Sequence, residues 1–184
     1  MSRSHGVTST TTNNLIIDSG AVYLDYGESG EVLLGATRGG NTFSITTEYR
    51  EMEFDGSRGP VVGGRRITRV DTKLTANIVE FSPELIQYAL PGSTETDNTT
   101  YMTIARALQL ATTDHHTNVA IVGESSGAPS VPVVCRVLNP IVDGGFEMAF
   151  ADKDETVLTL EFSGHFTVAA FDTEPWSIDY PVIA

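Results

Sequence analysis

The sequence is poor in cysteine and in positive charge. Cys135 is the only cysteine among 184 residues, which excludes an internal disulfide and a four-cysteine zinc site. Its apolar surroundings, VPVVCRVL, predict a buried structural thiol. Lys and Arg total 11 against 24 Asp and Glu, which gives a formal net charge of −13. This balance argues against a protein that grips nucleic acid, because phosphate binding needs clustered cations.

Long apolar runs are also missing. No stretch approaches the roughly 20 residues that are needed to cross a bilayer, and the N-terminal MSRSHGVTSTTTNN lacks the apolar core of a signal peptide. We therefore expect a soluble protein that is made in a cytoplasm and has no membrane partner. A hydrophobic content of 40% and a length of 184 residues favour one globular domain over residues 1–184.

Alternation of apolar and polar residues predicts β-strands along most of the chain. We expect strands within 15–27, 31–40, 41–54, 66–81, 118–124, 131–138, 144–150 and 155–169. In 41–54, Phe43, Ile45 and Tyr49 share one face, opposite Ser44, Thr46 and Glu48. A change of phase at Met52 predicts a bulge near Arg50 or Glu51.

The segments 41–54 and 66–81 are longer than usual strands and are joined by the glycine-rich 55–66 (DGSRGPVVGGRR), which predicts a long projecting β-hairpin. In 66–81 the apolar face contains Val70, Leu74, Ala76 and Ile78, and the opposite face contains Arg69, Asp71, Lys73, Thr75 and Asn77. In 155–169, Leu158, Leu160, Phe162 and Phe166 oppose Glu155, Thr159, Glu161, Ser163 and His165.

One helix is expected in SPELIQYALPG (82–92). Ser82 is a good N-cap, Pro83 suits the first helical position, and Glu84 complements the positive end of the helix dipole. Residues 93–100 (STETDNTT) are predicted to form a polar loop. For 101–112 the pattern fits strand or helix, and we favour a strand. Many strands and one short helix predict an all-β fold, an antiparallel β-sandwich or barrel with a flanking helix.

The strongest catalytic motif is GESSG at 123–127, which matches the G-x-S-x-G nucleophile elbow, with Asp143 or Asp152 and then His165 in the required chain order. The elbow needs a helix directly after Ser125, but APSVPVV follows. We interpret the motif as a hairpin loop and keep a serine esterase as an alternative.

Metal-binding patterns are weak. His115 and His116 would point to opposite faces of a strand, so a solvated loop is favoured over a chelating pair. The acidic run 152–155 lacks the alternate ligands and the glycine of a calcium loop, and it reads as a charged turn. The sequence therefore predicts no enzyme, cofactor or metal.

Several segments, in order, resemble the major tail tube proteins of long-tailed, siphovirus-type bacteriophages. The matching segments are 20–45 (GAVYLDYGESGEVLLGATRGGNTFSI), 47–67 (TEYREMEFDGSRGPVVGGRRI), 76–90 (ANIVEFSPELIQYAL), 118–124, 131–166 and PWSIDYP at 175–181. Residues 92–116 depart from the pattern. The resemblance covers almost the whole chain.

The resemblance implies a structural virion protein whose six copies close into a ring with one continuous inner β-barrel. Rings would stack into a hollow tail tube through which DNA leaves, with a tape measure protein and a tail terminator protein as partners. The location would be the virion tail, assembled in the host cytoplasm. Two alternatives share the β-sandwich: the inner tube of a contractile tail or phage-like injection particle, which requires a sheath gene nearby, and a tail decoration module.

In such a barrel the polar strand faces would line the channel. The expected lumen residues are Asp71, Lys73, Thr75, Asn77, Glu155, Thr159, Glu161 and Ser163, with Glu48 as a weaker candidate. Carboxylates there would repel DNA, so that it passes without specific binding, while Arg69 and Lys73 would pair with acids across strands.

Contacts between subunits or rings are expected at the hairpin connection, at Trp176 and at two arms, 1–14 and 172–184. The candidates at the connection are Gly56, Arg58, Gly59, Pro60, Val61, Val62, Gly63 and Gly64. For 1–14 a frayed terminus is the alternative, and Trp176 needs an apolar surface on its own domain or on the next one.

Overall fold

The computed structural model describes residues 6–8, 10–16, 18, 20–106, 108–150, 152 and 155–182. The elements follow the chain as η1 (Thr11–Asn14), β1 (Ala21–Leu24), β2 (Val32–Leu33), β3 (Thr42–Glu51), β4 (Arg65–Ile78), α1 (Pro83–Ala89), β5 (Ser93–Asp97), β6 (Met102–Arg106), η2 (Thr112–Asp114), β7 (Asn118–Gly123), β8 (Val133–Leu138), β9 (Ile141–Val142), β10 (Leu158–Ser163) and β11 (Trp176–Asp179).

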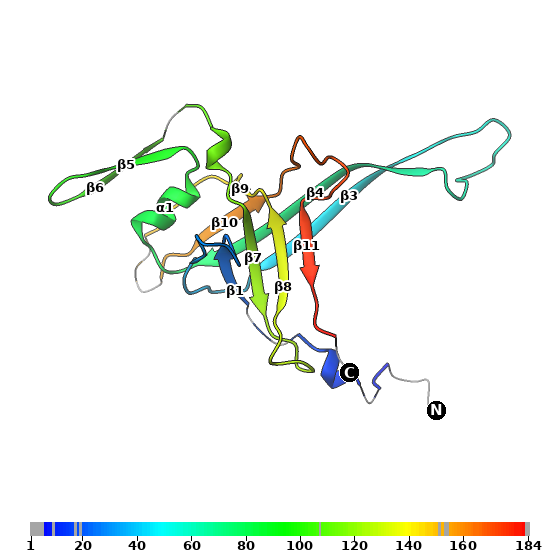
Figure 1. The fold of residues 1–184 in the computed structure, drawn as a ribbon, viewed down its shortest axis with the longest axis horizontal. Helices are drawn as coiled ribbons and strands as arrows, with labels where there is room; N and C mark the ends of the chain where they lie inside the picture. The colour runs from blue at the N-terminus through cyan, green and yellow to red at the C-terminus, as the bar shows by residue number, and fades with distance from the viewer. Residues whose placement is uncertain are drawn as a thin grey trace.

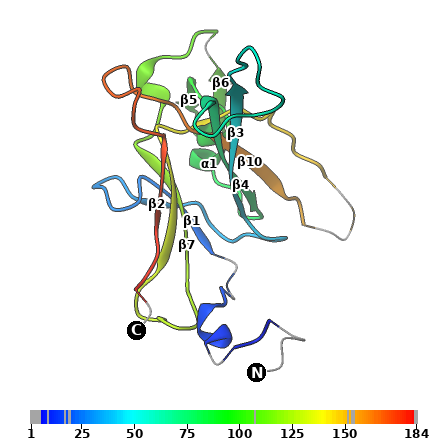
Figure 2. The same cartoon turned by 90° about the vertical axis from the view of Figure 1, so that its right-hand side faces the viewer.

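Two antiparallel sheets form a β-sandwich with one flanking α-helix in the described part of the chain (Figures 1 and 2). One sheet has the strand order β11-β8-β7-β1-β2 and the other β3-β4-β10-β9. The long β3–β4 hairpin projects from one end of the molecule, and the separate β5–β6 hairpin projects from the other end (Figure 1). The predicted antiparallel all-β fold with a short helix is confirmed.

The core lies between the two sheets and continues under α1. The strict alternation of β4 places Leu74, Ala76 and Ile78 on its buried face, where they are fully shielded from solvent. β10 adds Leu158, Leu160 and Phe162, and the opposite sheet adds Val22, Leu24, Val119 and Val137. Full burial of one side chain such as Phe162 contributes about 1.5–3 kcal/mol.

The helix begins and ends where its sequence signals predict. The Ser82 hydroxyl accepts a hydrogen bond from the Leu85 N–H at 3.1 Å, and Pro83 occupies the first turn. The backbone N–H of Glu84 itself and the Ser82 hydroxyl donate to the Glu84 carboxylate, and these hydrogen bonds lower the pKa of Glu84. Leu85 and Ala89 are buried against the sandwich, so the helix closes one end of the core.

The predicted bulge exists, but on the other strand. The partner of Glu48 is Arg69 and the partner of Tyr49 is Ile67, so Thr68 of β4 has no partner across the hairpin. Its hydroxyl donates to the Glu48 carbonyl at 3.2 Å. The side chains of β3 therefore keep their alternation past Glu48, and the phase change at Met52 marks the end of β3 instead.

Two segments were assigned wrongly from composition. Residues 93–97 are not a loop, because β5 pairs with β6 and the Asn98 N–H bonds the Tyr101 carbonyl at 2.9 Å to close the turn. Polar side chains hid a strand whose stability comes from backbone pairing. Residues 144–150 form no strand, and the two-residue β9 before them pairs with β10, between Pro140 and Gly144.

The strand β10 is shorter than the predicted 155–169. It ends before Gly164, where a Cβ atom would lie 2.8 Å from Val137 Cγ1, so the chain passes too close to β8 for any larger residue. Phe166 lies beyond the strand and is 36% exposed rather than part of the core. Glu155 lies before the first residue of β10.

Candidate channel and assembly surfaces

A continuous polar face covers the side of β3, β4 and β10 that points away from the core. Residues paired across antiparallel strands share a face, and the register pairs Thr42 with Thr75, Thr75 with Glu161 and Asn77 with Thr159. The structure thereby brings most of the predicted lumen residues together, namely Asp71, Lys73, Thr75, Asn77, Thr159, Glu161 and Ser163. Their assignment to a channel stays a prediction.

Glu155 and Ser163 differ from the rest of this polar face. Glu155 precedes β10 and forms an ion pair with Arg38 at 2.5 Å, so it is not on the strand as predicted. Ser163 is on the strand, but its hydroxyl is shielded from solvent and has no hydrogen-bond partner among the described residues.

Three hydroxyl residues of β3 belong to the same face and were not nominated from the sequence. Thr42, Ser44 and Thr46 pair with Thr75, Lys73 and Asp71, and all three are exposed. The alternation of β3 already separated Ser44 and Thr46 from the apolar residues. Only the pairing with β4 shows that they extend the face of that strand.

Ion pairs neutralise much of the charge on the polar face. The Lys73 ammonium donates to the Glu161 carboxylate of β10, and this hydrogen bond raises the pKa of Lys73. Arg69 donates to Asp71 on its own strand at 2.9 Å, which raises the pKa of Arg69. Lys73 therefore pairs across strands as expected, whereas Arg69 pairs along β4.

Positive and negative charges nearly balance on the polar face of β10 and of the β3–β4 hairpin, counted from the base of the hairpin as far as the pair of Glu48 with Arg69. Three carboxylates, from Glu48, Asp71 and Glu161, stand against two cations, Arg69 and Lys73, which leaves one net negative charge per chain. Hydroxyl groups supply most of the remaining surface. The face is thus hydrophilic and slightly acidic.

The predicted contact residues within 56–64 form the tip of the β3–β4 hairpin, where 56–63 are exposed and Gly64 is buried. Short backbone bonds fold this tip, with Met52 N–H to the Gly64 carbonyl at 2.7 Å and Gly64 N–H to the Val61 carbonyl at 2.9 Å. Gly56 and Gly63 adopt φ values of +88° and +84°, which glycine tolerates without strain. Phe54 and Val62 are exposed, so the tip carries apolar surface far from the core (Figure 1).

Trp176 lies on β11, the edge strand next to β8, and pairs with Val137. Its indole is half-buried on its own domain and donates to Glu174 Oε2 at 2.5 Å. Ile178 and Tyr180 after it are each 46% exposed. Residues 176–179 of the expected C-terminal arm are therefore part of the sandwich, and residues 183–184 lie outside the described residues.

The GESSG segment does not present a nucleophile. Ser125 is 1% exposed, and its hydroxyl lies 3.5 Å from the Asn13 carbonyl oxygen. The Ser126 N–H bonds the Leu15 carbonyl at 3.0 Å, and Ile16 bridges to Ser125. The inner end of the N-terminal arm thus covers this loop. Residues 1–5 and 9 of the arm lie outside the described residues.

Cys135 is more exposed than the predicted buried thiol. His115 and His116 are less exposed than the predicted solvated loop. Cys135 is half-buried, and removal from water is the main cause that raises the pKa of its thiol. His115 and His116 are also half-buried. The His115 ring meets the His165 ring edge-on at 5.0 Å, and the His116 ring meets the Tyr88 ring at 5.3 Å.

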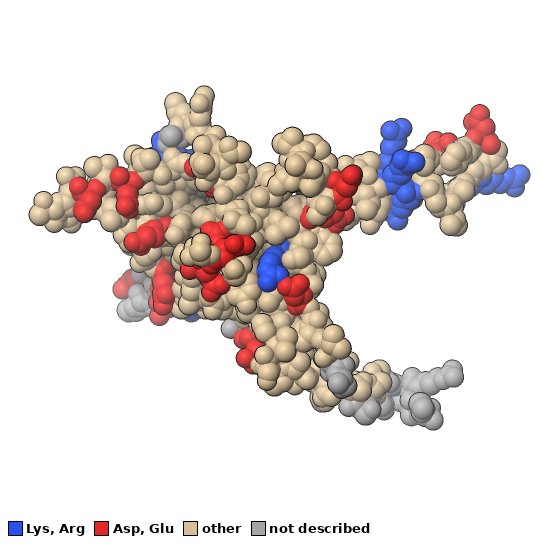
Figure 3. All heavy atoms as spheres, viewed as in Figure 1, with Lys and Arg blue, Asp and Glu red and all other residues tan. Residues whose placement is uncertain are grey.

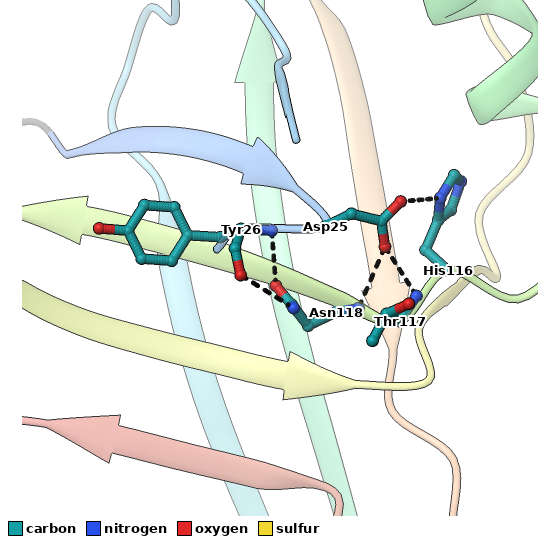
Figure 4. A network of polar contacts seen from close by, with 5 residues as sticks. All are labelled: Asp25, Tyr26, His116, Thr117 and Asn118. Carbon is teal, nitrogen blue, oxygen red and sulfur yellow. Dashed lines mark hydrogen bonds and ion pairs between the residues drawn. The ribbon is translucent and has the colours of Figure 1, made fainter. Parts of the chain in front are cut away.

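His116 belongs to a polar network that joins the end of β1 to the start of β7 (Figure 4). Asp25 accepts from the Thr117 N–H at 2.7 Å, and its other carboxylate oxygen lies 3.2 Å from His116 Nδ1. Asn118 accepts from the Tyr26 N–H at 3.0 Å and donates to the Tyr26 carbonyl at 3.2 Å. These bonds hold Asp25 at a φ of +50°, so the network has a structural role.

The described residues contain no group of three or more His, Cys, Asp or Glu side chains arranged to hold a metal ion. Within those same ranges, no helix has the length and apolar character to span a bilayer. Of the acidic turn 152–155, residues 153 and 154 lie outside the described part.

The sequence matches no family model, and no curated protein matches it. Among solved structures, the fold is similar to a chain of the sheath–tube complex of an extracellular contractile injection system, PVC, in the extended state. The TM-score is 0.51 at 11% sequence identity, over 96% of this chain and 99% of that chain.

Two further chains give lower scores. One is from the tail of an empty gene transfer agent particle with C6 symmetry, with a TM-score of 0.46 and 10% identity over 89% of this chain and 96% of that one. The other is from the anti-feeding prophage baseplate, with a TM-score of 0.45 and 12% identity over 80% and 89%. The match with the TM-score of 0.51 shows that this fold also occurs in the sheath–tube complex of a contractile injection system.

Proposed function

We propose that this chain is a structural tube protein of a phage tail or phage-like injection particle, which closes into hexameric rings that stack into a hollow tube. The observation that carries the proposal is the open edge of the β3-β4-β10-β9 sheet, which would be the inner sheet of such a ring. β3 is ten residues long, lies at the sheet edge and pairs only with β4 among the described strands. A long edge with unpaired backbone groups promotes uncontrolled association unless another strand covers it, and ring closure does so in a defined way.

The polar face supports the same conclusion. Closing the β3-β4-β10-β9 sheet of six copies into one barrel buries the apolar side of the sheet in each sandwich and leaves the other side facing the channel. That side carries Thr42, Ser44, Thr75 and Thr159 with the Lys73–Glu161 pair. Over β10 and the hairpin up to Arg69, hydroxyls and neutralised charges offer no cluster of free cations to phosphate, so DNA would pass this part without specific binding.

Two kinds of tail fit this proposal about equally. One is the non-contractile tube of a siphovirus-type tail, for which we infer a tape measure protein and a tail terminator as partners. The other is the inner tube of a contractile particle, which the similarity to a chain of a sheath–tube complex supports. In both, the protein acts in the particle's tail, is assembled in the host cytoplasm and catalyses no reaction. A sheath gene beside this one separates them.

Electron microscopy of the purified protein over a range of concentrations tests the proposal. We expect six-fold rings at low concentration and tubes at high concentration. Monomers at every concentration, or a decoration-like monomer that binds only to preformed tails, would contradict it. An ester hydrolysis assay with Ser125→Ala as control tests the esterase alternative, which the burial of Ser125 disfavours.

A further inference from the structure

The outer part of the β3–β4 hairpin is weakly basic on an acidic protein. Residues 50–69 contain five of the 11 cations, and the same segment has only three carboxylates, Glu51, Glu53 and Asp55. The segment therefore carries +2, and since the whole chain carries −13, the rest carries −15. Figure 3 shows Lys and Arg side chains along the projecting hairpin, with some acidic side chains near its tip, while acidic side chains predominate over the body and the opposite end.

Two opposed arginines on this hairpin form no ion pair with any described residue. Arg50 and Arg66 face each other directly across β3 and β4, beyond the Thr68 bulge, and both are exposed. Neither forms an ion pair within the described ranges, whereas Arg65 lies 4.1 Å above the Tyr49 ring and 3.8 Å from Glu51. Like charges directly opposite each other destabilise a strand pair, so this arrangement needs an external anion to become favourable.

The opposite end of the molecule carries a matching pair of carboxylates (Figures 1 and 3). Glu95 and Asp97 lie two residues apart on β5, so they share one face at a spacing of about 6.6 Å. Gln87 of α1 donates a hydrogen bond to Glu95 and orients it. Arg106, on the same face, stands at the base of the hairpin opposite Ser93, away from Asp97.

The β5–β6 hairpin is expected to be only marginally stable in an isolated chain. It is a two-stranded sheet separate from both layers of the sandwich, and such a sheet is marginally stable in water. Tyr101 and Met102 at its turn are 75% and 41% exposed. Its fold is therefore stabilised when a partner covers it.

We propose that Arg50 and Arg66 of one copy bind Glu95 and Asp97 of the next copy, as a head-to-tail electrostatic contact between stacked subunits. The inference rests on the proposed tube function and names its contact. The two pairs lie at opposite ends of one molecule, which is the arrangement that a heterologous, repeating contact requires. The strongly negative remainder of every neighbouring copy provides the complementary field.

A second copy fits the arginines better than nucleic acid does. Arg50 and Arg66 continue the polar face of β3 and β4, because only β4 carries the bulge. If this face lines a channel, unpaired arginines would hold DNA phosphates and stop its passage. Pairing with carboxylates of the next copy removes that obstacle.

The contact is tested with a double charge reversal and with a rescue variant that has the net charge of the wild type. Arg50→Glu with Arg66→Glu should fold like the wild type but raise the critical concentration for tube formation at least about tenfold, because four carboxylates then meet. Adding Glu95→Arg and Asp97→Arg to the same chain restores complementarity and returns the net charge to −13. This fourfold variant should form tubes again.

The matched control adds Glu28→Arg and Glu124→Arg to the hairpin reversal instead. Both residues are exposed and outside the two hairpins, and the net charge is again −13. It should not restore assembly. Rescue by both sets, or by neither, overturns the contact. Normal tubes from the hairpin reversal, with lost binding of a fluorescent DNA duplex, would assign the arginines to nucleic acid. A wild type that never assembles would reject the tube function itself.

Discussion

Glu161 lies diagonally opposite Lys73 across β4 and β10, and its carboxylate accepts a hydrogen bond from the lysine ammonium. Lys73 pairs directly with Ser163, and Glu161 pairs directly with Thr75. The ion pair therefore connects two strands through their polar face. It occupies the ammonium group of Lys73, so that this cation is less available to other anions.

Replacing Glu161 by lysine should convert this neutral pair into two adjacent cations. In a hexameric ring the change adds six cations and frees six others, each of which can bind phosphate. We expect tubes to form, because the side chain does not enter the core, and DNA ejection to slow, most strongly at low salt where screening is weak. Ejection kinetics of assembled particles measure the effect. Glu147→Lys, with the same charge change on an exposed residue off the strands, is the control.

If neither Glu161→Lys nor Glu147→Lys changes the rate of DNA ejection at low salt, the polar face does not contact DNA. If Glu161→Lys prevents folding, the pair has a structural role that its exposure does not suggest.

The raised pKa of Lys73 predicts a pH dependence at the alkaline end. A lysine whose pKa is higher in the folded state contributes stability below its unfolded pKa, near 10.5, and loses that contribution as pH rises through the folded value. The stability difference between wild type and Lys73→Gln should be constant from pH 7 to about 10 and shrink above that. Urea unfolding at fixed ionic strength measures it. A difference that grows above pH 10.5 would have the wrong sign.

The sequence predicted the parts of the fold that alternate strictly. In β4, residues 70–78 keep one phase, and both faces follow from it. The helix was predictable because its signals are local: a cap at Ser82 and Pro91 with Gly92 beyond the last turn.

The remaining features depend on pairing between distant segments, which periodicity does not encode. The β5 strand is polar throughout, and only its partner β6 makes it a strand. The end of β10 is set by the approach of Gly164 to Val137. The opposed Arg50 and Arg66 result from the Thr68 bulge in the partner strand, so the sequence of β3 alone does not show them.

Thr72 should be better replaced by valine. It lies on the core face of β4 at 1% exposure, and its hydroxyl has no hydrogen-bond partner among the described residues. A buried hydroxyl without a partner costs about 1–3 kcal/mol, so Thr72→Val should increase the free energy of unfolding by roughly 1 kcal/mol after packing differences. Denaturant unfolding measures this, with Thr75→Val on the polar face as a near-neutral control. Destabilisation by Thr72→Val would show that the hydroxyl is satisfied, for instance by an internal water.

Ser82→Ala should destabilise the protein by about 1 kcal/mol. The hydroxyl caps the Leu85 N–H at the start of α1, and this helix closes one end of the core. Equilibrium unfolding should show a lower midpoint with an unchanged slope. Thr99→Ala in the exposed β5–β6 turn provides a control for loss of a hydroxyl from the surface. Equal effects of the two substitutions would mean that the cap does not contribute.

Deleting Gly56–Gly64 should separate folding from assembly. The strands β3 and β4 would stay joined by residues 52–55, a four-residue loop of ordinary length for a hairpin, so the pair of Glu51 with Arg65 is retained. The deletion removes the apolar tip around Val61 and Val62, which makes no contribution to the core. We expect a folded monomer with near-wild-type stability that forms no tubes at concentrations where the wild type does. Circular dichroism and electron microscopy measure the two properties. Val61→Ser with Val62→Ser keeps the length of the loop, and loss of assembly in this variant too would assign the effect to apolar contact rather than to reach. Normal tubes from the deletion would exclude the tip from assembly and leave the hairpin strands, with Arg50 and Arg66, as the part that acts between subunits.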